Sequence, residues 1–138
     1  MADHFHNRQI PFGFNQFSET EDPRREDFDI YTGQPHNPLL WEIKMDWLSA
    51  ITGNLFVEEK TLNNTKAHKI AYGRLFIDVF DTDRLRQMYE AFDHGVYKYR
   101  HVIGGDQANN RGMLLGWKDC KDNSKPFWLA VKELTQRE

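Results

Sequence analysis

Cysteine is nearly absent from this chain: Cys120 is the one thiol among 138 residues, which excludes an internal disulfide. Long hydrophobic runs are missing as well, since no stretch of about 18 apolar residues occurs, and this excludes a helix that spans a membrane. The first residues carry no cationic stretch followed by an apolar run, so we expect no secretory signal. Because a lone cysteine suits a reducing compartment, these features together predict a cytoplasmic protein without membrane contact.

A strong excess of one charge is also lacking. Lys and Arg number 18 and Asp and Glu number 21, which gives a formal net charge of -3. This balance argues against a protein that nucleic acid holds mainly through its phosphates. It allows a nucleic-acid enzyme in which acidic groups hold metal and basic groups cluster locally. An aromatic content of 14% argues against a disordered chain, and the length is that of one domain.

The chain divides by composition into an irregular N-terminal arm, residues 1–26, and a single domain, residues 27–138. The arm mixes aromatic and polar side chains without a period, and residues 18–27 are almost entirely charged or polar. We expect its aromatic residues to dock on the core or on a second subunit, and a partly disordered terminus is the alternative. These aromatic residues are Phe5, Phe12, Phe14 and Phe17.

Strands come first in the domain and helices later, which predicts an α/β (α+β) fold with a mixed β-sheet flanked by helices. The expected strands are residues 28–31, 39–47, 55–61, 75–80, 96–103 and 113–117. The expected helices are one that begins at Arg84 and stops at His94, and one over residues 125–134.

Asp29, Glu42 and Lys44 form the one constellation that carries chemistry. Asp29 lies on a short predicted strand, and alternation places Glu42 and Lys44 on one face of the next. If these strands pair, the two carboxylates adjoin and make a hard-oxygen site that suits Mg²⁺. An ammonium group beside it can orient a water or balance charge on a phosphate. By itself, Glu-x-Lys is common on solvated strand faces, so the spacing alone decides little.

Three further motifs follow in a fixed order, and the order is more specific than any one motif. After EIKMD at 42–46, which contains Glu42 and Lys44, these motifs are TGNLFVE at 52–58, DTDRLR at 81–86 and GGDQANN at 104–110. Over about residues 28–118 this chain resembles small phage-encoded members of the PD-(D/E)xK nuclease superfamily. The resemblance implies a restriction-endonuclease-like fold and a metal-dependent endonuclease that acts on DNA.

The resemblance also implies roles for single residues. Asp29 and Glu42 would be ligands of Mg²⁺ or Mn²⁺, with the carbonyl of Ile43 as a third ligand. Lys44 would act on the attacking water or on the transition-state charge. Three residues match the motifs without a fixed role and are expected to border the site: Asp46, Asn54 and Glu58.

The front of the domain departs from the superfamily pattern. Members usually carry an acidic residue on a helix before the first catalytic strand, whereas here Pro23 interrupts residues 18–27. Glu21 or Glu26 could substitute for that residue. A second register also competes, because Asp46 followed by Glu58 and Lys60 is again Asp…Glu-x-Lys. We favour the first register, since its opposite strand face is wholly apolar.

Basic side chains elsewhere complete the predicted DNA enzyme. The residues expected to contact the phosphate backbone are Lys60, Lys98, Arg100 and Arg111. We expect a homodimer, because one short domain offers little surface for a duplex. We also expect a branched or structured DNA substrate. A phage-encoded enzyme would work in the host cytoplasm. The alternative is a catalytically inactive nuclease-like module that binds a protein partner, which the acidic net charge favours.

Overall fold

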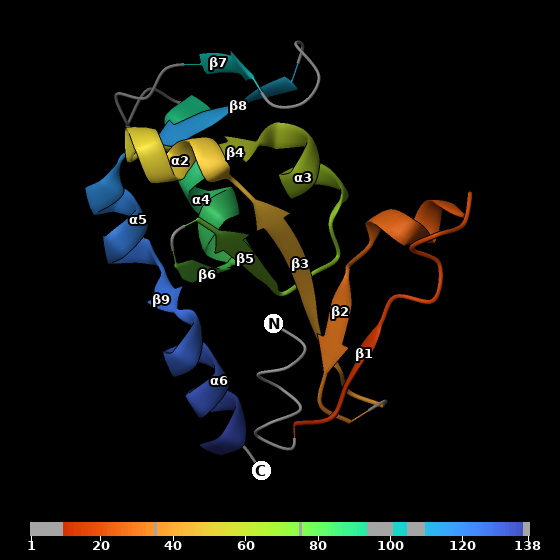
Figure 1. Ribbon diagram of the computed structural model, residues 1–138. Helices are drawn as coiled ribbons and strands as arrows, with labels where there is room; N and C mark the ends of the chain where they lie inside the picture. Colours follow the sequence, from red (N-terminus) through yellow and green to blue (C-terminus); the bar gives the residue numbers. More distant parts are fainter. Residues whose placement is uncertain (1–9, 35, 75, 94–100, 105–109, 137–138) are drawn as a thin grey trace.

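The computed structural model describes residues 10–34, 36–74, 76–93, 101–104 and 110–136. Within these residues, a six-stranded sheet forms the centre of the fold and a three-stranded sheet lies above it in Figure 1. The larger sheet contains, in spatial order, β1 (Phe12–Phe14), β2 (Ile30–Thr32), β3 (Leu39–Met45), β5 (Lys69–Gly73), β6 (Ile77–Asp81) and β9 (Lys125–Pro126). The smaller sheet contains β4 (Leu55–Glu58), β8 (Asn110–Leu115) and β7 (His101–Gly104).

Helices flank the larger sheet. They are η1 (Pro23–Glu26, a 3₁₀ turn), α2 (Trp47–Thr52), α3 (Glu59–Asn64), α4 (Thr82–Asp93), α5 (Trp117–Asn123) and α6 (Phe127–Gln136). Strands β3 and β5 pair in parallel and every other pair described in this sheet is antiparallel. The predicted mixed sheet flanked by helices is therefore confirmed.

Strand β3 lies inside the sheet and divides the two faces by its alternation. On one face Trp41 is fully buried, and its ring meets Phe127 of α6 edge-to-face with the ring centroids 6.3 Å apart. Ile43 packs against the same cluster, but Met45 at the strand end is 56% exposed, so this face is less completely covered than predicted. Glu42 and Lys44 lie on the other face.

That other face of the sheet supports the second and larger hydrophobic cluster. Ile70 and Tyr72 of β5 contribute from the sheet, and the remaining members come from α3, α4, α5, β4, β6 and β8. Burial of these side chains fixes the smaller sheet and α3 over the strands that carry Glu42 and Lys44. The members are Leu55, Val57, Leu62, Ile70, Tyr72, Phe80, Leu85, Met88, Tyr89, Met113, Leu115 and Cys120.

Three predicted strands extend too far. The one expected over residues 113–117 ends at Leu115, and α5 begins at Trp117. The other two also run into helices. The strand expected over residues 39–47 ends at Met45, because the Asp46 carboxylate accepts the Ser49 amide proton at 3.0 Å and begins α2. The strand expected over residues 55–61 ends at Glu58, where α3 begins. Both corrections replace the end of an extended strand by a helix of six residues.

Other elements were missed or shifted. Strand β5 and helix α5 were not predicted, and α4 begins at Thr82, two residues before Arg84. The closing helix begins at Phe127 rather than at residue 125. Of the strand predicted over residues 96–103, residues 96–100 lie outside the described residues, as do His94 and the greater part of the 104–110 motif.

The described part of the N-terminal arm contains regular structure. Strand β1 pairs with β2, with Gly13 opposite Tyr31, so the arm adds an edge strand to the sheet. Pro23 is the first residue of η1, where its missing amide proton costs nothing, and Asp22 caps the turn. The division between arm and domain after residue 26 stays a prediction. Across the described chain, no helix combines the length and apolar character needed to cross a bilayer.

Candidate active site

The pairing of β2 with β3 brings Asp29 beside Glu42. Ile30 is opposite Trp41 in the antiparallel register, so the preceding residue, Asp29, faces Glu42 across the two strands. The Asp29 amide donates to the Trp41 carbonyl at 2.8 Å, and Asp29 Oδ2 accepts the Ile43 amide proton at 2.7 Å. The strands therefore pair through the proline-containing connection, as the sequence predicted.

Glu42 is held from two sides. The Thr65 hydroxyl donates to Glu42 Oε2 at 3.3 Å, and Lys44 Nζ lies 3.6 Å from Glu42 Oε1. The Glu42 side chain is 13% exposed and that of Lys44 is 37% exposed. Thr65 in turn is fixed, because its hydroxyl also contacts the Asp27 carbonyl at 3.2 Å and accepts the Ala67 amide proton at 3.1 Å. The carboxylate thus has a defined position before any ligand arrives.

The environment of Glu42 disfavours its negative charge. Burial raises the pKa of Glu42 from 4.5 to about 7, and the charge of Asp29 acts in the same direction. The Lys44 ammonium group and the Thr65 hydroxyl lower it, but they do not offset the first two effects. A buried carboxyl group with a raised pKa, next to a second carboxylate, is a common feature of sites that receive a cation or a proton.

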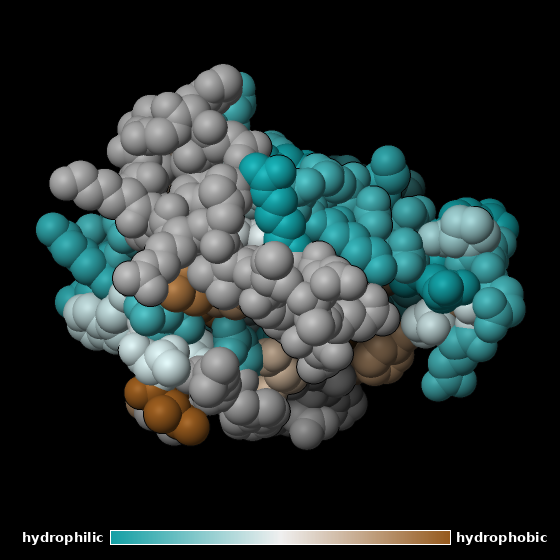
Figure 2. Space-filling model, turned by 90° about the horizontal axis from the view of Figure 1, so that it is seen from above, coloured by the Kyte–Doolittle hydropathy of each residue, from teal (hydrophilic) through white to brown (hydrophobic). Residues whose placement is uncertain are grey.

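A cleft of about 440 Å³ opens beside this pair. It receives four residues that the sequence analysis selected, namely Glu42, Lys44, Glu58 and Lys60. Asp29 borders Glu42 but does not line the cleft itself. Six further residues line it, and all are polar or charged: Ser18, Arg25, Glu26, Thr61, Asn64 and Thr65. In Figure 2, the part of the upper surface over α3 and the η1 segment is correspondingly hydrophilic.

Of the two acidic residues considered as substitutes for a front-helix carboxylate, one lines the cleft. Glu26, the last residue of η1, lines the cleft with Glu42. Glu21 instead is fully exposed and lies 3.7 Å from Arg25. In the sequence, the only indication that Glu26 could belong to the site was its position three residues before Asp29. The 3₁₀ turn that directs it to the cleft was not predictable from residue periodicity.

Asp46 and Lys60, from the competing register, are placed in different surroundings. Both Asp46 oxygens accept backbone amide protons, Oδ1 from Ser49 at 3.0 Å and Oδ2 from Phe56 at 3.1 Å, so its carboxylate joins the start of α2 to β4. Lys60 lies on α3 rather than on a strand, and it lines the same cleft as Lys44. Glu58 and Lys60 of the second register therefore line the same cleft as Glu42 and Lys44 of the first.

The remaining predicted residues lie farther away. Asn54 is in the turn before β4, where its amide donates to the Thr52 hydroxyl at 3.2 Å. Arg111 is exposed on β8 and lies 3.6 Å from Glu59 of α3. Lys98 and Arg100 lie outside the described residues.

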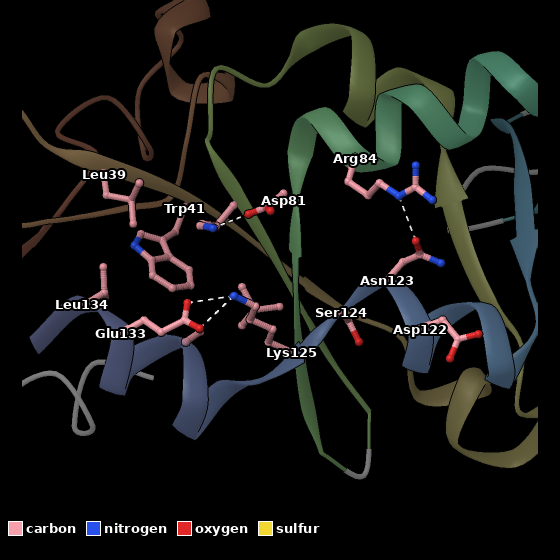
Figure 3. A pocket seen from close by; sticks show the side chains of 13 residues that line it. Leu39, Trp41, Asp81, Arg84, Asp122, Asn123, Ser124, Lys125, Glu133 and Leu134 are labelled. Atoms are coloured by element: carbon pink, nitrogen blue, oxygen red, sulfur yellow. Dashed lines mark hydrogen bonds and ion pairs between the residues drawn. The ribbon is translucent and has the colours of Figure 1, made fainter. Parts of the chain in front are cut away.

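Another pocket, of about 250 Å³, lies between the sheet and helices α5 and α6 (Figure 3). Four of its charged side chains form two ion pairs, Lys125 with Glu133 at 2.8 Å and Lys69 with Asp81. Arg84 donates to Asn123 at 2.8 Å. Because neither Glu42 nor Lys44 lines this pocket, we place the candidate site at the Glu42 cleft.

The donor set at Glu42 fits a hard divalent cation. Within the described part of the chain, no group of three or more His, Cys, Asp or Glu side chains has metal-binding geometry. A Mg²⁺ site needs fewer protein ligands, since one or two carboxylates suffice and water completes the shell. Asp29 Oδ1 has no hydrogen-bond partner among the described residues, and a cation would relieve the repulsion that raises the pKa of Glu42.

Comparisons with known proteins bear on the fold. No protein-family model matches this chain and no curated protein is similar to it in sequence. Among solved structures, it is similar to Hjc from Archaeoglobus fulgidus, a Holliday junction resolvase from an archaeal hyperthermophile, with a TM-score of 0.51. The identity is 12%, and the match covers 95% of this chain and 95% of that one. The fold is thus restriction-endonuclease-like, as the resemblance implied.

Proposed function

We propose that this chain is a metal-dependent endonuclease that hydrolyses phosphodiester bonds in DNA. One observation carries the proposal: Asp29 and Glu42 adjoin on paired strands, and the Lys44 ammonium group lies 3.6 Å from Glu42 at the edge of a polar cleft. Two carboxylates and a lysine in this arrangement are what metal-assisted hydrolysis of a phosphodiester requires. The resolvase fold supports the assignment, and the motif order supports a small enzyme of the phage-encoded type.

The residues that would hold Mg²⁺ or Mn²⁺ are Asp29, Glu42 and, through its carbonyl, Ile43. When bound, such a cation supplies electrostatic stabilisation of the charge that develops on the scissile phosphate. Glu42 must be ionised to take part, so the enzyme should gain activity as the pH rises toward about 7. Asp29 fixes the β3 backbone at Ile43 through its hydrogen bond to the amide.

Lys44 would complete the chemistry. Its ammonium group can orient the attacking water by a hydrogen bond and can offset negative charge in the transition state. Its contact with Glu42 positions it for this role and also lowers the pKa of that carboxyl group. Since the interaction with the transition state is stronger than that with bound DNA, Lys44 should contribute to the rate more than to affinity.

Two further cations in the cleft would contact the DNA backbone. Lys60 has no ion pair or hydrogen bond within the described chain and lines the cleft from α3. Arg25 lines it from η1, where its guanidinium lies 3.7 Å from the exposed Glu21. Lys60 and Arg25 would lie on opposite sides of a DNA backbone that enters the cleft. A net charge of -3 is compatible with a DNA substrate if these cations contact phosphates locally.

The proposed substrate is a branched or otherwise structured DNA, and the proposed active form is a homodimer. The structural similarity to a junction resolvase supports the first part. The small size of the domain supports the second, because a duplex arm needs more surface than one copy offers.

A nicking assay on supercoiled plasmid and on branched DNA tests the function. We expect cleavage with Mg²⁺ or Mn²⁺, none with a chelator, and a loss of at least a hundredfold in Glu42→Gln. The matched control is Glu90→Gln, which changes an exposed carboxyl group on α4. If the parent protein cleaves no DNA form with either metal, the inactive binding module is the correct assignment.

A further inference from the structure

A second recess adjoins the candidate cleft and has a different character. Its volume is about 560 Å³, and its lining is mainly aromatic and aliphatic. The residues of the aromatic recess are Phe14, Asn15, Gln16, Phe17, Arg24, Phe28, Tyr31, Pro38 and Leu40. Residues that are consecutive in the chain divide between the two hollows: Phe17 lines the recess and Ser18 the cleft, and Arg24 lines the recess and Arg25 the cleft.

The recess and the catalytic pair lie on the same face of the sheet. Leu40 and Glu42 lie on one side of β3. Asp29 directly precedes β2 and lies on the same side of that strand as Tyr31. Tyr31 is opposite Leu40 in the register, as Asp29 is opposite Glu42. The recess therefore begins two residues along the strands from the carboxylates, which corresponds to roughly 7 Å. A nucleotide next to a phosphate bound at Glu42 would reach it.

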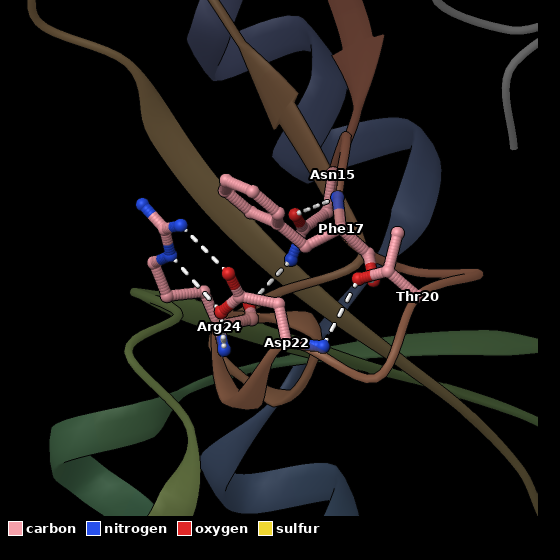
Figure 4. Close-up of polar contacts among 5 residues, drawn as sticks. All are labelled: Asn15, Phe17, Thr20, Asp22 and Arg24. Carbon is pink, nitrogen blue, oxygen red and sulfur yellow. Dashed lines mark hydrogen bonds and ion pairs between the residues drawn. The ribbon is translucent and has the colours of Figure 1, made fainter.

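The wall of the recess is fixed by a hydrogen-bond network (Figure 4). Asn15 is buried, and its amide donates to the carbonyls of Arg24 and Phe28 at 2.9 and 2.8 Å. Asn15 Oδ1 accepts the Phe17 amide proton at 2.9 Å. Asp22 holds the Arg24 guanidinium through two contacts, at 3.0 and 2.6 Å. The recess is thus preorganised by contacts that do not depend on a ligand.

Tyr31 forms the floor and owes its position to a glycine. A Cβ atom at Gly13 would lie 2.4 Å from the Tyr31 ring, so only glycine allows the ring to lie across β1. The Phe28 ring meets Tyr31 edge-to-face with a centroid distance of 6.4 Å. Phe14, which also lines the recess, is 62% exposed, and its ring meets Phe12 edge-to-face with the centroids 6.1 Å apart.

The charge of the recess selects the kind of ligand. Among the described residues that line the recess, Arg24 is the only charged one, and Asp22 neutralises it. The guanidinium carbon lies 3.9 Å from the centroid of the Phe17 ring, so Arg24 is held flat against the wall. A phosphate gains little from a neutralised cation, whereas a flat, uncharged ring gains stacking on aromatic faces and hydrogen bonds from the exposed Gln16.

We infer that the aromatic recess receives one unstacked nucleobase of the DNA substrate, from the nucleotide next to the phosphate bound at Glu42. The inference rests on the proposed function and specifies its substrate: DNA with an unpaired or easily unpaired base beside the cleavage point. Intact duplex holds its bases in the stack, so the recess would favour branch points and mismatches. Stacking is tolerant of base identity, and the preference would be for structure rather than sequence.

Equilibrium binding with a chelator present, which prevents hydrolysis, tests the inference. The probe is a branched DNA with one unpaired 2-aminopurine at the branch, compared with the same DNA carrying an abasic position there. We expect the protein to bind the abasic DNA about 5- to 150-fold more weakly, and to quench the 2-aminopurine fluorescence on binding. Phe14→Ala should bind both DNAs alike, with the lower affinity.

Phe76→Ala is the matched control, since Phe76 is 80% exposed on the β5–β6 connection, away from the recess, and should behave as the parent does. The inference is wrong if the parent does not distinguish the two DNAs, or if Phe14→Ala weakens both by the same factor. If the parent cleaves DNA but binds the 2-aminopurine and abasic DNAs equally, the inference is wrong and the proposed function still stands. Absence of any DNA binding here, together with no cleavage in the nicking assay, would remove both. Loss of a dimer in Phe14→Ala, seen by sedimentation without an effect of the base, would assign the recess to a second copy.

Discussion

The pH dependence of stability should carry the signature of Glu42. In the folded protein its pKa is about 7 because of burial and the neighbouring Asp29, whereas its ordinary value is 4.5. The difference corresponds to about 3 kcal/mol. A raised carboxyl pKa means that the folded state binds the proton more tightly than the unfolded chain. The contribution of Glu42 to stability is therefore complete below about pH 4.5 and is lost as the pH rises through about 7.

Glu42→Gln removes this titration and keeps the shape of the side chain, including an acceptor for the Thr65 hydroxyl. Between pH 5 and pH 8, the free energy of unfolding of the parent should fall by about 2.5 kcal/mol more than that of the variant. The measurement is urea unfolding at several pH values with a chelator present. Glu90→Gln, the exposed control, should follow the parent. Parallel pH profiles for the parent and Glu42→Gln would refute the reasoning.

Three other predictions concern metal, capping and assembly. Mn²⁺ should raise the melting temperature, with an affinity that increases up to about pH 7 and then levels off, and Asp29→Asn should abolish the effect; an unchanged melting curve of the parent contradicts the site. Asp46→Ala should lower stability by about 1 kcal/mol through loss of the α2 cap while nicking persists, which urea unfolding and the plasmid assay check together. Deleting residues 1–17 removes β1 and should lower stability and shift a dimer toward monomer in sedimentation; equality with the full chain in both would show that the arm contributes to neither.

The central part of the fold was accessible from sequence because its signals are local. Alternation over Trp41, Glu42, Ile43 and Lys44 defines β3 and its two faces, and the short run before Gly33 defines β2. The pairing of these two strands then followed from the short proline-containing connection between them. Asp29 and Glu42, the two carboxylates of the proposed site, adjoin because of this pairing, so their proximity was predictable.

Elsewhere, residue periodicity did not distinguish short helices from strands. Helices α2 and α3 have six residues each, fewer than two turns, and such a length shows no helical period. Phe56, Glu58 and Lys60 alternate as a strand would, although the chain turns into α3 after Glu58. Strand β5 was missed because a strand paired in parallel on one side and buried on both faces does not alternate.

The cleft shows what residue patterns do not contain. Arg25 and Glu26 approach Glu42 only because η1 folds back beside β3, and Thr65 does so only because α3 ends there. No spacing in the sequence relates these residues to Glu42. Such contacts depend on how distant segments pack, and packing became visible only in three dimensions.

The lysine pair of the cleft provides the most direct test of the account. Single-turnover cleavage and equilibrium binding of one branched DNA would be measured for the parent, Lys44→Ala and Lys60→Ala. Lys44→Ala should lose at least a hundredfold in rate with near-normal binding, because its charge acts mainly in the transition state. Lys60→Ala should keep most of the rate and bind more weakly, with a smaller salt dependence. Full cleavage by Lys44→Ala, with loss of cleavage in Lys60→Ala, would contradict the assignment of Asp29, Glu42 and Lys44.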